Sequence, residues 1–111
     1  MNVKVTKLGV GTYLQPNGAL VEENLGDLRA AVQTLGREGP AHVVVDLCHV
    51  PFFDSAGLEY LLDLSVAQRE AGGSLRLANA NAIGRDVLAM TRLDRTIAVY
   101  QDLESAGRSF V

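Results

Sequence analysis

One stretch of the sequence restricts the fold more than any other: an apolar run, His42 to Phe53, leads directly into a segment with helical spacing. Val43 to Val45 are β-branched and suit a buried strand, whereas Pro51 has no backbone N–H with which to continue a ladder. The strand should therefore end near Asp46 or Leu47. The run predicts a buried strand that is followed by a turn into a helix.

The turn itself carries a small hydroxyl. Asp54 and Ser55 precede a helical segment that runs from Leu58 to Ala71, and either side chain can accept a hydrogen bond from the free N–H groups of the first turn. Leu58, Leu61, Leu62 and Ser65 follow at helical spacing. One face of this helix should pack inward. Ser55 should lie at the helix N-terminus, where backbone donors and the helix dipole favour an anion such as a phosphate. From spacing alone, a helix cap is the commonest role of such a pair.

Strand and helix patterns alternate along the rest of the chain. Before the central stretch we expect two short antiparallel strands (Val3 to Leu8 and Thr12 to Gln15), a turn at Pro16-Asn17-Gly18, an amphipathic helix from Glu22 to Leu35 and a separating Gly39-Pro40 pair. After it we expect a strand from Ser74 to Ala78, a helix capped by Asn79 or Asn81 with Ile83, Val87 and Met90 among its apolar positions, a strand from Thr96 to Tyr100 and a helix from Asp102 to Arg108. Strands that alternate with helices predict parallel connections within one sheet. A chain of 111 residues is long enough for one domain with its own core.

Composition narrows the choice of partners and of core residues. Hydrophobic residues make up 48% of the chain but aromatic residues only 5%, so the core should consist of Leu, Val, Ala and Ile. The formal net charge is −3 and the basic residues are dispersed, which argues against nucleic acid as the main partner. The single cysteine, Cys48, cannot form an internal disulfide, and at the end of an apolar strand it is expected to be a small buried residue.

The N-terminus has no basic region followed by a long apolar stretch. No run approaches the ~18 apolar residues that a membrane-spanning helix needs. We therefore expect a cytoplasmic protein that does not insert into a membrane.

The central turn does not have the pattern of a serine hydrolase. Such an enzyme would carry Gly-x-Ser-x-Gly or an equivalent oxyanion arrangement with a histidine in reach, whereas Phe53 stands two residues before Ser55. His49 lies near in sequence, but a structural histidine in a loop is the simpler interpretation. Asp46 and Asp54 could serve as an acid–base pair or bind a cation, yet a strand end and a helix cap explain them more simply. The sequence also has no phosphate-binding loop, so it does not have the pattern of an enzyme.

Two strings around the turn resemble the signature of STAS domains, the family of bacterial anti-sigma factor antagonists: Val43-Val44-Val45-Asp46-Leu47 and Phe53-Asp54-Ser55-Ala56-Gly57-Leu58. Downstream, Ala71 to Leu77 resembles the family's turn and next strand, and Val87 to Asp94 resembles its following helix and loop. Because the resemblance covers nearly the whole chain, we expect residues 1–111 to form a single STAS domain. It implies an α/β fold with a mixed β-sheet of four to five strands and about four helices.

The resemblance also implies a function. In the family the serine directly after the aspartate is the phosphorylation site, which corresponds to Ser55. The implied partner-binding residues are Val21, Asp54, Ser55, Ala56, Gly57 and Leu58. The implied partners are an anti-sigma factor with serine kinase activity, bound while Ser55 is unphosphorylated, and a Ser/Thr phosphatase that acts on phospho-Ser55; a weak homodimer is compatible with the family. Transcription would be regulated indirectly, with no cofactor and no metal.

The sequence departs from the family at two positions. Members often have Ser or Thr where this chain has Ala56, so Ser55 is left as the only local hydroxyl to accept a phosphate. Many members have Gly-x-Leu-Asp after the second strand, where this chain has Gly18-Ala19-Leu20-Val21 and lacks the acid. The second departure leaves open an alternative function, an unphosphorylated STAS scaffold or a regulatory subunit of a stress-signalling or lipid-transport complex.

Overall fold

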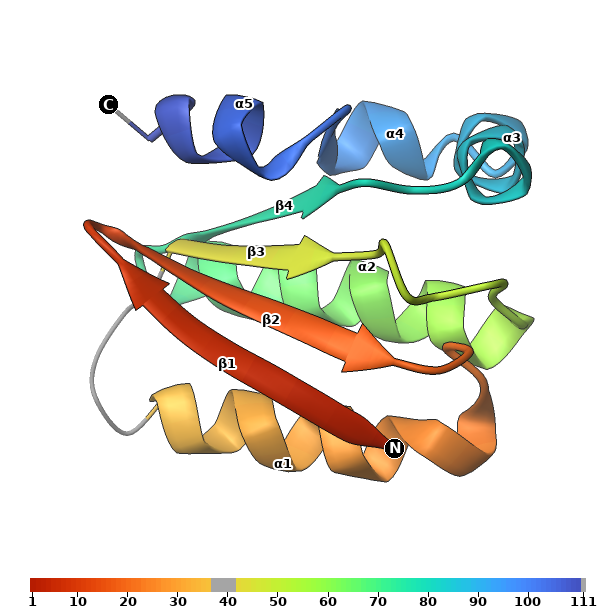
Figure 1. The fold of residues 1–111 in the computed structure, drawn as a ribbon, viewed down its shortest axis with the longest axis horizontal. Coiled ribbons are helices and arrows are strands. Elements are labelled where there is room, and N and C mark those ends of the chain that lie inside the picture. Colours follow the sequence, from red (N-terminus) through yellow and green to blue (C-terminus); the bar gives the residue numbers. More distant parts are fainter. Residues whose placement is uncertain (37–41, 111) are drawn as a thin grey trace.

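The structure is a computed structural model that describes residues 1–36 and 42–110. The described strands form one mixed sheet in the order β1-β2-β3-β4-β5 (Figure 1). Their bounds are β1 Asn2–Leu8, β2 Gly11–Asn17, β3 His42–Asp46, β4 Ser74–Ala78 and β5 Ala98–Tyr100. The helices are the short 3-10 helix η1 Glu22–Asn24, then α1 Leu25–Gly36, α2 Ser55–Glu70, α3 Ala82–Met90, α4 Leu93–Thr96 and α5 Leu103–Arg108. The Gly39-Pro40 pair lies outside the described residues.

The sheet combines both pairing directions, as expected. β1 runs antiparallel to β2, while β2, β3, β4 and β5 pair in parallel. In the described chain a helix lies between each pair of successive parallel strands, which is the connection that parallel neighbours require. The expectation of four to five strands is confirmed, and the helices slightly exceed the expected number because of the short α4.

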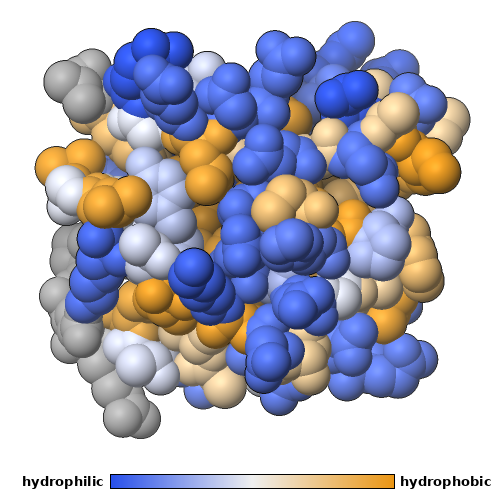
Figure 2. Space-filling view, in the orientation of Figure 1, coloured by the Kyte–Doolittle hydropathy of each residue, from blue (hydrophilic) through white to orange (hydrophobic). Residues whose placement is uncertain are grey.

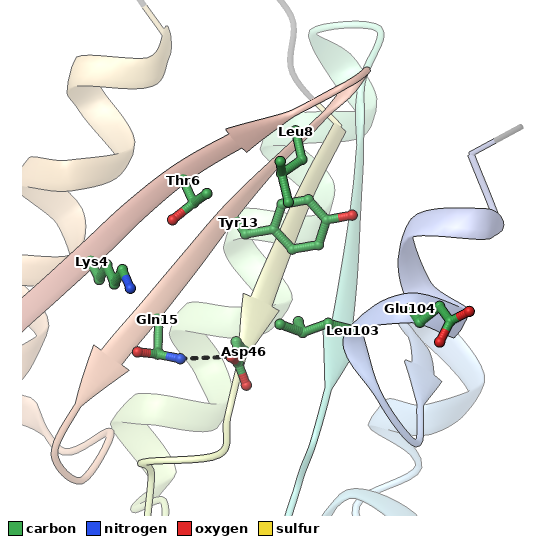
Figure 3. Close-up of a pocket in the computed structure, with 8 residues that line it drawn as sticks. All are labelled: Lys4, Thr6, Leu8, Tyr13, Gln15, Asp46, Leu103 and Glu104. Atoms are coloured by element: carbon green, nitrogen blue, oxygen red, sulfur yellow. Dashed lines mark hydrogen bonds between the residues drawn. The ribbon is translucent and has the colours of Figure 1, made fainter.

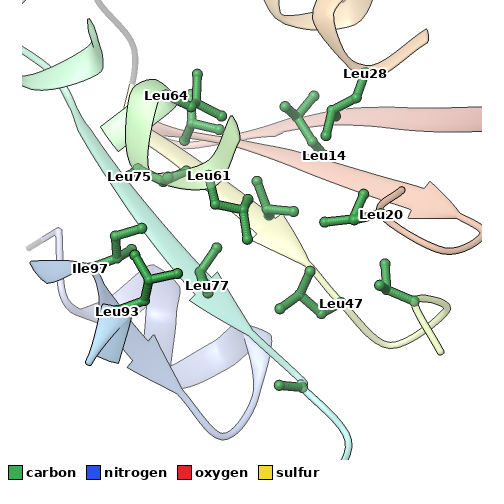
Figure 4. Packing of buried hydrophobic residues seen from close by; sticks show 14 of the residues in the cluster. Leu14, Leu20, Leu28, Leu47, Leu61, Leu64, Leu75, Leu77, Leu93 and Ile97 are labelled. Carbon is green, nitrogen blue, oxygen red and sulfur yellow. The ribbon is translucent and has the colours of Figure 1, made fainter. Parts of the chain in front are cut away.

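The two faces of the sheet are covered unequally. Residues of α1, α2, α3 and α4 join Val43 and Val45 of β3 in the main apolar cluster (Figure 4). On the opposite face, a smaller cluster joins Val44 and Ala78 to Ala106 of α5, with Leu103 and Phe110 packed against it. The core is built from Leu, Val, Ala and Ile, as the composition predicts, and α5 alone packs on the second face in this way.

Pro16 and Asn17 do not form the predicted turn. Both belong to β2, where Pro16 pairs with Val3 of β1. The pairing of β2 with β3 reaches only as far as Leu14, so the strand has a free edge at Pro16 and tolerates a residue without an N–H. The chain turns later, at Gly18, whose φ of +150° suits glycine.

The last predicted strand begins too early. Thr96 is the final residue of α4, and β5 starts at Ala98. Arg92 adopts a left-handed conformation with φ 62° after α3, and a new short helix begins at Leu93. Because the Ile97 N–H donates to the Leu93 carbonyl at 2.8 Å, the chain leaves the helix only after Thr96.

The apolar spacing in the sequence of α3 does not mark its inward face. Ile83 and Met90 are 66% and 76% exposed, whereas Gly84 and Leu88 are buried. Gly84 fits inward because a Cβ there would already contact the Phe53 ring at 3.4 Å. In α2, likewise, helical spacing does not show which positions face the core. Leu61 and Ser65 are buried, but Leu62 is 37% exposed.

Cys48 is exposed, contrary to the expectation of a buried residue. β3 ends at Asp46, so Cys48 already belongs to the turn in which the Val50 N–H donates to the Leu47 carbonyl at 3.0 Å. Partial desolvation and the neighbouring Asp46 carboxylate raise the pKa of the Cys48 thiol. A raised pKa disfavours the reactive thiolate.

Candidate functional site

The loop between β3 and α2 holds the predicted site, and Asp54 fixes its geometry. Asp54 is the N-cap of α2 in an extended conformation, and its Oδ1 accepts the Gly57 N–H at 2.8 Å. Its backbone carbonyl accepts the Leu58 N–H at 3.1 Å. The sequence left open whether Asp54 or Ser55 caps α2. The structure assigns the cap to Asp54, so the Ser55 side chain is not needed for capping.

Ser55 is the first residue of α2 and is exposed to solvent. Its hydroxyl thus lies at the positive end of a helix of 16 residues, where a phosphate would be favoured by the dipole and the free backbone N–H groups. The neighbouring Asp54 side chain is acidic, however, and the adjoining loop carries the acid Glu22, whose N–H binds Asp54, so the charge added by a phosphate would increase the negative potential of this surface. The exposed hydroxyl can be modified without opening the core.

A second loop, residues 18–22, docks against the Ser55 loop. The Leu20 N–H donates to the Phe52 carbonyl, and the Leu20 carbonyl accepts the Asp54 N–H, both at 3.1 Å. The free Oδ2 of Asp54 accepts the Glu22 N–H at 3.1 Å. Asp54 therefore joins the two loops as well as capping α2.

The close contact of these loops requires glycine at position 57. A Cβ on Gly57 would lie 2.0 Å from the Leu20 carbonyl oxygen, a distance that no pair of unbonded atoms tolerates. Gly57 is buried, so it sets the spacing of the site and does not offer a contact surface. Leu58 is half-buried and packs against the main core cluster.

The structure brings Val21 to the same site. Val21 precedes η1, is half-buried, and is followed by Glu22, whose N–H binds Asp54. Together with the half-buried Ala56 and the exposed Ser55, it lies on the surface formed by the two loops. The six predicted partner-binding residues are thus close in space although about thirty positions separate Val21 from the others in the sequence.

Sequence reasoning missed two exposed apolar side chains at this site. Phe52 is 53% exposed within the Ser55 loop, and Ile83 is 66% exposed at the start of α3. Asn81 ties the two segments together, because it caps α3 through the Gly84 N–H and donates its Nδ2 to the Pro51 carbonyl at 3.1 Å. The signal for Ile83 was present as apolar spacing, but that spacing does not show which side of a helix faces the core.

The apolar stripe of α3 lies on a definite side of the helix. On one flank of α3, Arg85 lines a hollow together with Val99 and Tyr100 of β5. By helical geometry, Ile83 and Met90 fall on the opposite flank, away from β5. The exposed apolar residues of α3 therefore lie on the flank that faces away from β5.

A polar cluster at the end of β3 holds the start of the Ser55 loop. Asp46, 2% exposed, accepts hydrogen bonds from Gln15 Nε2 at 2.9 Å, Asn79 Nδ2 at 3.0 Å and the Cys48 N–H at 3.1 Å. Burial by itself raises the pKa of Asp46, but these hydrogen bonds outweigh it and lower the pKa below its ordinary value. Asp46 is therefore a structural anion that fixes the turn after β3, as the strand-end interpretation suggested.

The family model for the STAS domain matches residues 2–106. The chain belongs to the STAS domain family. This match covers almost the whole chain, and it confirms the expected family and fold class. The comparison with curated proteins gave no match.

Solved structures share the fold of this STAS domain. An anti-sigma factor antagonist of Thermotoga maritima is 23% identical, with a TM-score of 0.88, over 96% of this chain and 92% of that chain. The anti-sigma factor antagonist SpoIIAA, in its unphosphorylated form, is 17% identical, with a TM-score of 0.77, over 97% of this chain and 96% of its own; the Bacillus protein has also been solved in its phosphorylated form. The murine anion transporter Slc26a9 is 18% identical, with a TM-score of 0.77, but this STAS domain covers only 18% of that chain.

In the described part of this STAS domain, no helix is both long and apolar enough to cross a bilayer. The family of anti-sigma factor antagonists consists of binding modules without catalysis.

Proposed function

We propose that this STAS domain is an anti-sigma factor antagonist whose partner binding is controlled by phosphorylation of Ser55. The observation that carries the proposal is the exposed Ser55 hydroxyl at the N-terminus of α2, beside a cap that Asp54 provides. Unphosphorylated, the surface around Ser55 would bind an anti-sigma factor that is also a serine kinase and so release a sigma factor. A Ser/Thr phosphatase acting on phospho-Ser55 would restore the binding form.

The contact surface supports a protein partner. Phe52 and Ile83 are exposed apolar side chains on either side of the Asn81–Pro51 hydrogen bond, and Ser55 follows Phe52 by three residues. Apolar and aromatic residues that surround a small polar centre are typical of the buried part of a protein interface. SpoIIAA, which shares the fold, exists in phosphorylated and unphosphorylated forms.

Electrostatics explains how one phosphate would act as a switch. Phosphorylation adds about −1.5 to −2 charges at pH 7, and the helix dipole compensates by at most ~1 kcal/mol at an exposed position. In a complex, the same charge would be desolvated among Phe52, Ile83 and the acids Asp54 and Glu22. A cost of about 3 kcal/mol in the complex weakens binding more than a hundredfold, so the domain can lose its partner without unfolding.

The test compares wild type with Ser55→Ala and Ser55→Asp for binding to the kinase-type anti-sigma factors of the source organism. We expect Ser55→Ala to bind but to take up no phosphate by mass spectrometry, and Ser55→Asp to bind at least about tenfold more weakly. Ser105→Asp is the matched control, since Ser105 also lies in the first turn of a helix, α5, but on the other face of the sheet. Equal affinity of all four proteins would refute the switch.

The alternative is a scaffold or regulatory subunit of a stress-signalling or lipid-transport complex that uses the fold without phosphorylation. Its supporting observation is Val21, an apolar residue beside Asp54 at the position where the family resemblance implies an acid. Affinity purification of the tagged chain distinguishes the two functions. A transporter ATPase or a large stable assembly in place of a kinase would favour the alternative.

A further inference from the structure

A hollow lies on the half of the sheet that α5 leaves open. It has a volume of about 270 Å³ and lies between the β1–β2 hairpin, the end of β3 and the start of α5 (Figure 3). Its lining residues are Lys4, Thr6, Leu8, Tyr13, Gln15, Asp46, Leu103 and Glu104. None of these residues belongs to the Ser55 site, so the hollow calls for an explanation of its own.

The most buried polar residue of the hollow's lining, Asp46, is negatively charged. Asp46 is buried and accepts its hydrogen bonds from neutral groups, Gln15, Asn79 and the Cys48 N–H. These bonds keep the carboxylate ionised but do not neutralise its charge, and a charge in a poorly hydrated environment acts over a longer distance than one in water. Glu104 adds a second carboxylate at the rim.

The side chain of Gln15 presents an acceptor to the hollow. Its Nε2 donates to Asp46 Oδ2 at 2.9 Å, so its Oε1 points away from Asp46, as Figure 3 shows. An amide oxygen accepts hydrogen bonds only. The polar lining near Asp46 therefore suits a ligand that donates hydrogen bonds and carries positive charge.

Apolar side chains make up much of the remaining lining of the hollow. Tyr13 and Leu103 are half-buried there, and Leu8 is 61% exposed. Val10, which follows Leu8 at the hairpin turn, is 65% exposed, and Figure 2 shows hydrophobic surface at the end of the molecule where the β1–β2 hairpin turns. A large exposed apolar side chain beside a hollow is a feature of ligand sites, since water gains little from contact with it.

We propose that this hollow binds a small organic ammonium compound, with the ammonium beside Gln15 and Asp46 and a short apolar body against Tyr13, Leu8 and Leu103. The volume of about 270 Å³ lies just below the range of about 300–1,000 Å³ for small-molecule sites, which suits only a small ligand, and the Tyr13 ring can add a cation–π contact. A carboxylate or phosphate ligand would instead face two acids. Lys4, at the rim on a flexible stem, is the one basic residue of the lining, and it competes with the ligand cation.

The first test is an NMR titration of the full chain with n-butylammonium chloride, with n-butanol and sodium butyrate as probes of equal chain length. The ammonium should shift the amide signals of Tyr13, Gln15 and Leu103 in a saturable manner and bind at least about tenfold more tightly than either other probe. Equal effects of the three probes, or tightest binding of butyrate, would overturn the proposal, as would the absence of saturable shifts at these residues.

Variants then locate the site. Asp46→Asn should weaken n-butylammonium binding about tenfold and Lys4→Ala should strengthen it about threefold, because they remove an attractive and a competing charge. Should Asp46→Asn fail to fold, Thr6→Trp fills the hollow from β1 and should abolish binding. Its matched control is Val5→Trp, on the same strand but with the side chain on the opposite face of the sheet. Unchanged affinity in Thr6→Trp and Lys4→Ala, or equal loss in Val5→Trp, would refute this location.

Discussion

At the scale of single residues, the Ser55 site depends on one glycine and one aspartate. Gly57 allows the Leu20 carbonyl to approach α2 so closely that no side chain fits between them. Both carboxylate oxygens of Asp54 accept hydrogen bonds, one from the Gly57 N–H of α2 and one from the Glu22 N–H of the neighbouring loop. The position of the Ser55 hydroxyl follows from these two residues, although neither needs to contact a partner through a protruding side chain.

Gly57→Ala should therefore destabilise the domain by about 3 kcal/mol, since a backbone carbonyl, unlike a side-chain end, cannot rotate away from the new methyl group. Gly26→Ala is the matched control, because Gly26 lies in α1 and a methyl group added there would have nothing within 4 Å. There, alanine should stabilise by about 0.5–1 kcal/mol. Urea denaturation of both variants measures the difference, and a Gly57→Ala protein as stable as wild type would contradict the close contact.

Asp46 gives the domain a predictable dependence on pH. Its folded-state pKa is lowered from the ordinary value of 3.8, so its stabilising contribution is complete above that value and is lost as the pH falls through the folded-state pKa. Compared with wild type, Asp46→Asn should be less stable at neutral pH, and the gap should narrow below about pH 4. Denaturation curves at several pH values measure the gap. A gap that stays constant down to about pH 2 would show that Asp46 acts without its charge.

At the scale of elements, α3 shows how a helix can expose the apolar side that its sequence suggests is buried. Its inward positions are occupied by Gly84 and Leu88, and the smallness of Gly84 lets the Phe53 ring pack against the helix. Ile83, Val87 and Met90 are left on the outer flank, beside the Ser55 loop to which Asn81 ties the helix. The helix thus contributes a surface to the site in addition to its packing in the core.

Ile83→Ser and Met90→Ser should each change the free energy of unfolding by less than about 0.5 kcal/mol, because both side chains are largely exposed. Leu88→Ala in the same helix should lower it by about 2–4 kcal/mol, since Leu88 is buried in the main cluster. Urea titrations of the three variants test this assignment. If Ile83→Ser proved as destabilising as Leu88→Ala, the orientation of α3 would be wrong.

At the scale of the whole molecule, the Ser55 hydroxyl is separated from the parts that provide stability. The main cluster lies between the sheet and helices α1 to α4, whereas Ser55 is on the surface at the N-terminus of α2. The hollow of the second face lies between the β1–β2 hairpin and α5. Each of these surfaces can gain a charge or a ligand without a rearrangement of the core.

Ser55→Asp should accordingly leave the thermal unfolding midpoint within about 4 °C of wild type, which corresponds to about 0.5–1 kcal/mol for a domain of this size. Calorimetry measures the midpoint, and amide spectra should change only for residues near the two loops of the site. A large loss of stability, with changes throughout the sheet, would mean that any loss of partner binding reflects unfolding and not a local charge.

The sequence by itself indicated the family through its resemblance to the STAS signature. It also determined the order of strands and helices and the place of Ser55 directly after a strand-to-helix turn, because these depend on local patterns: β-branched runs, helical spacing and capping residues. It left undecided whether Asp54 or Ser55 caps α2 and which flank of α3 faces outward, and it misplaced Pro16, Cys48 and Thr96. Only the tertiary structure decided those points and brought Val21, Phe52 and Ile83 to Ser55. The physical reason is that the apolar character of a side chain does not show whether it is buried or exposed. Which side of a helix is buried depends on the residues that pack against it, and those residues are distant in the sequence.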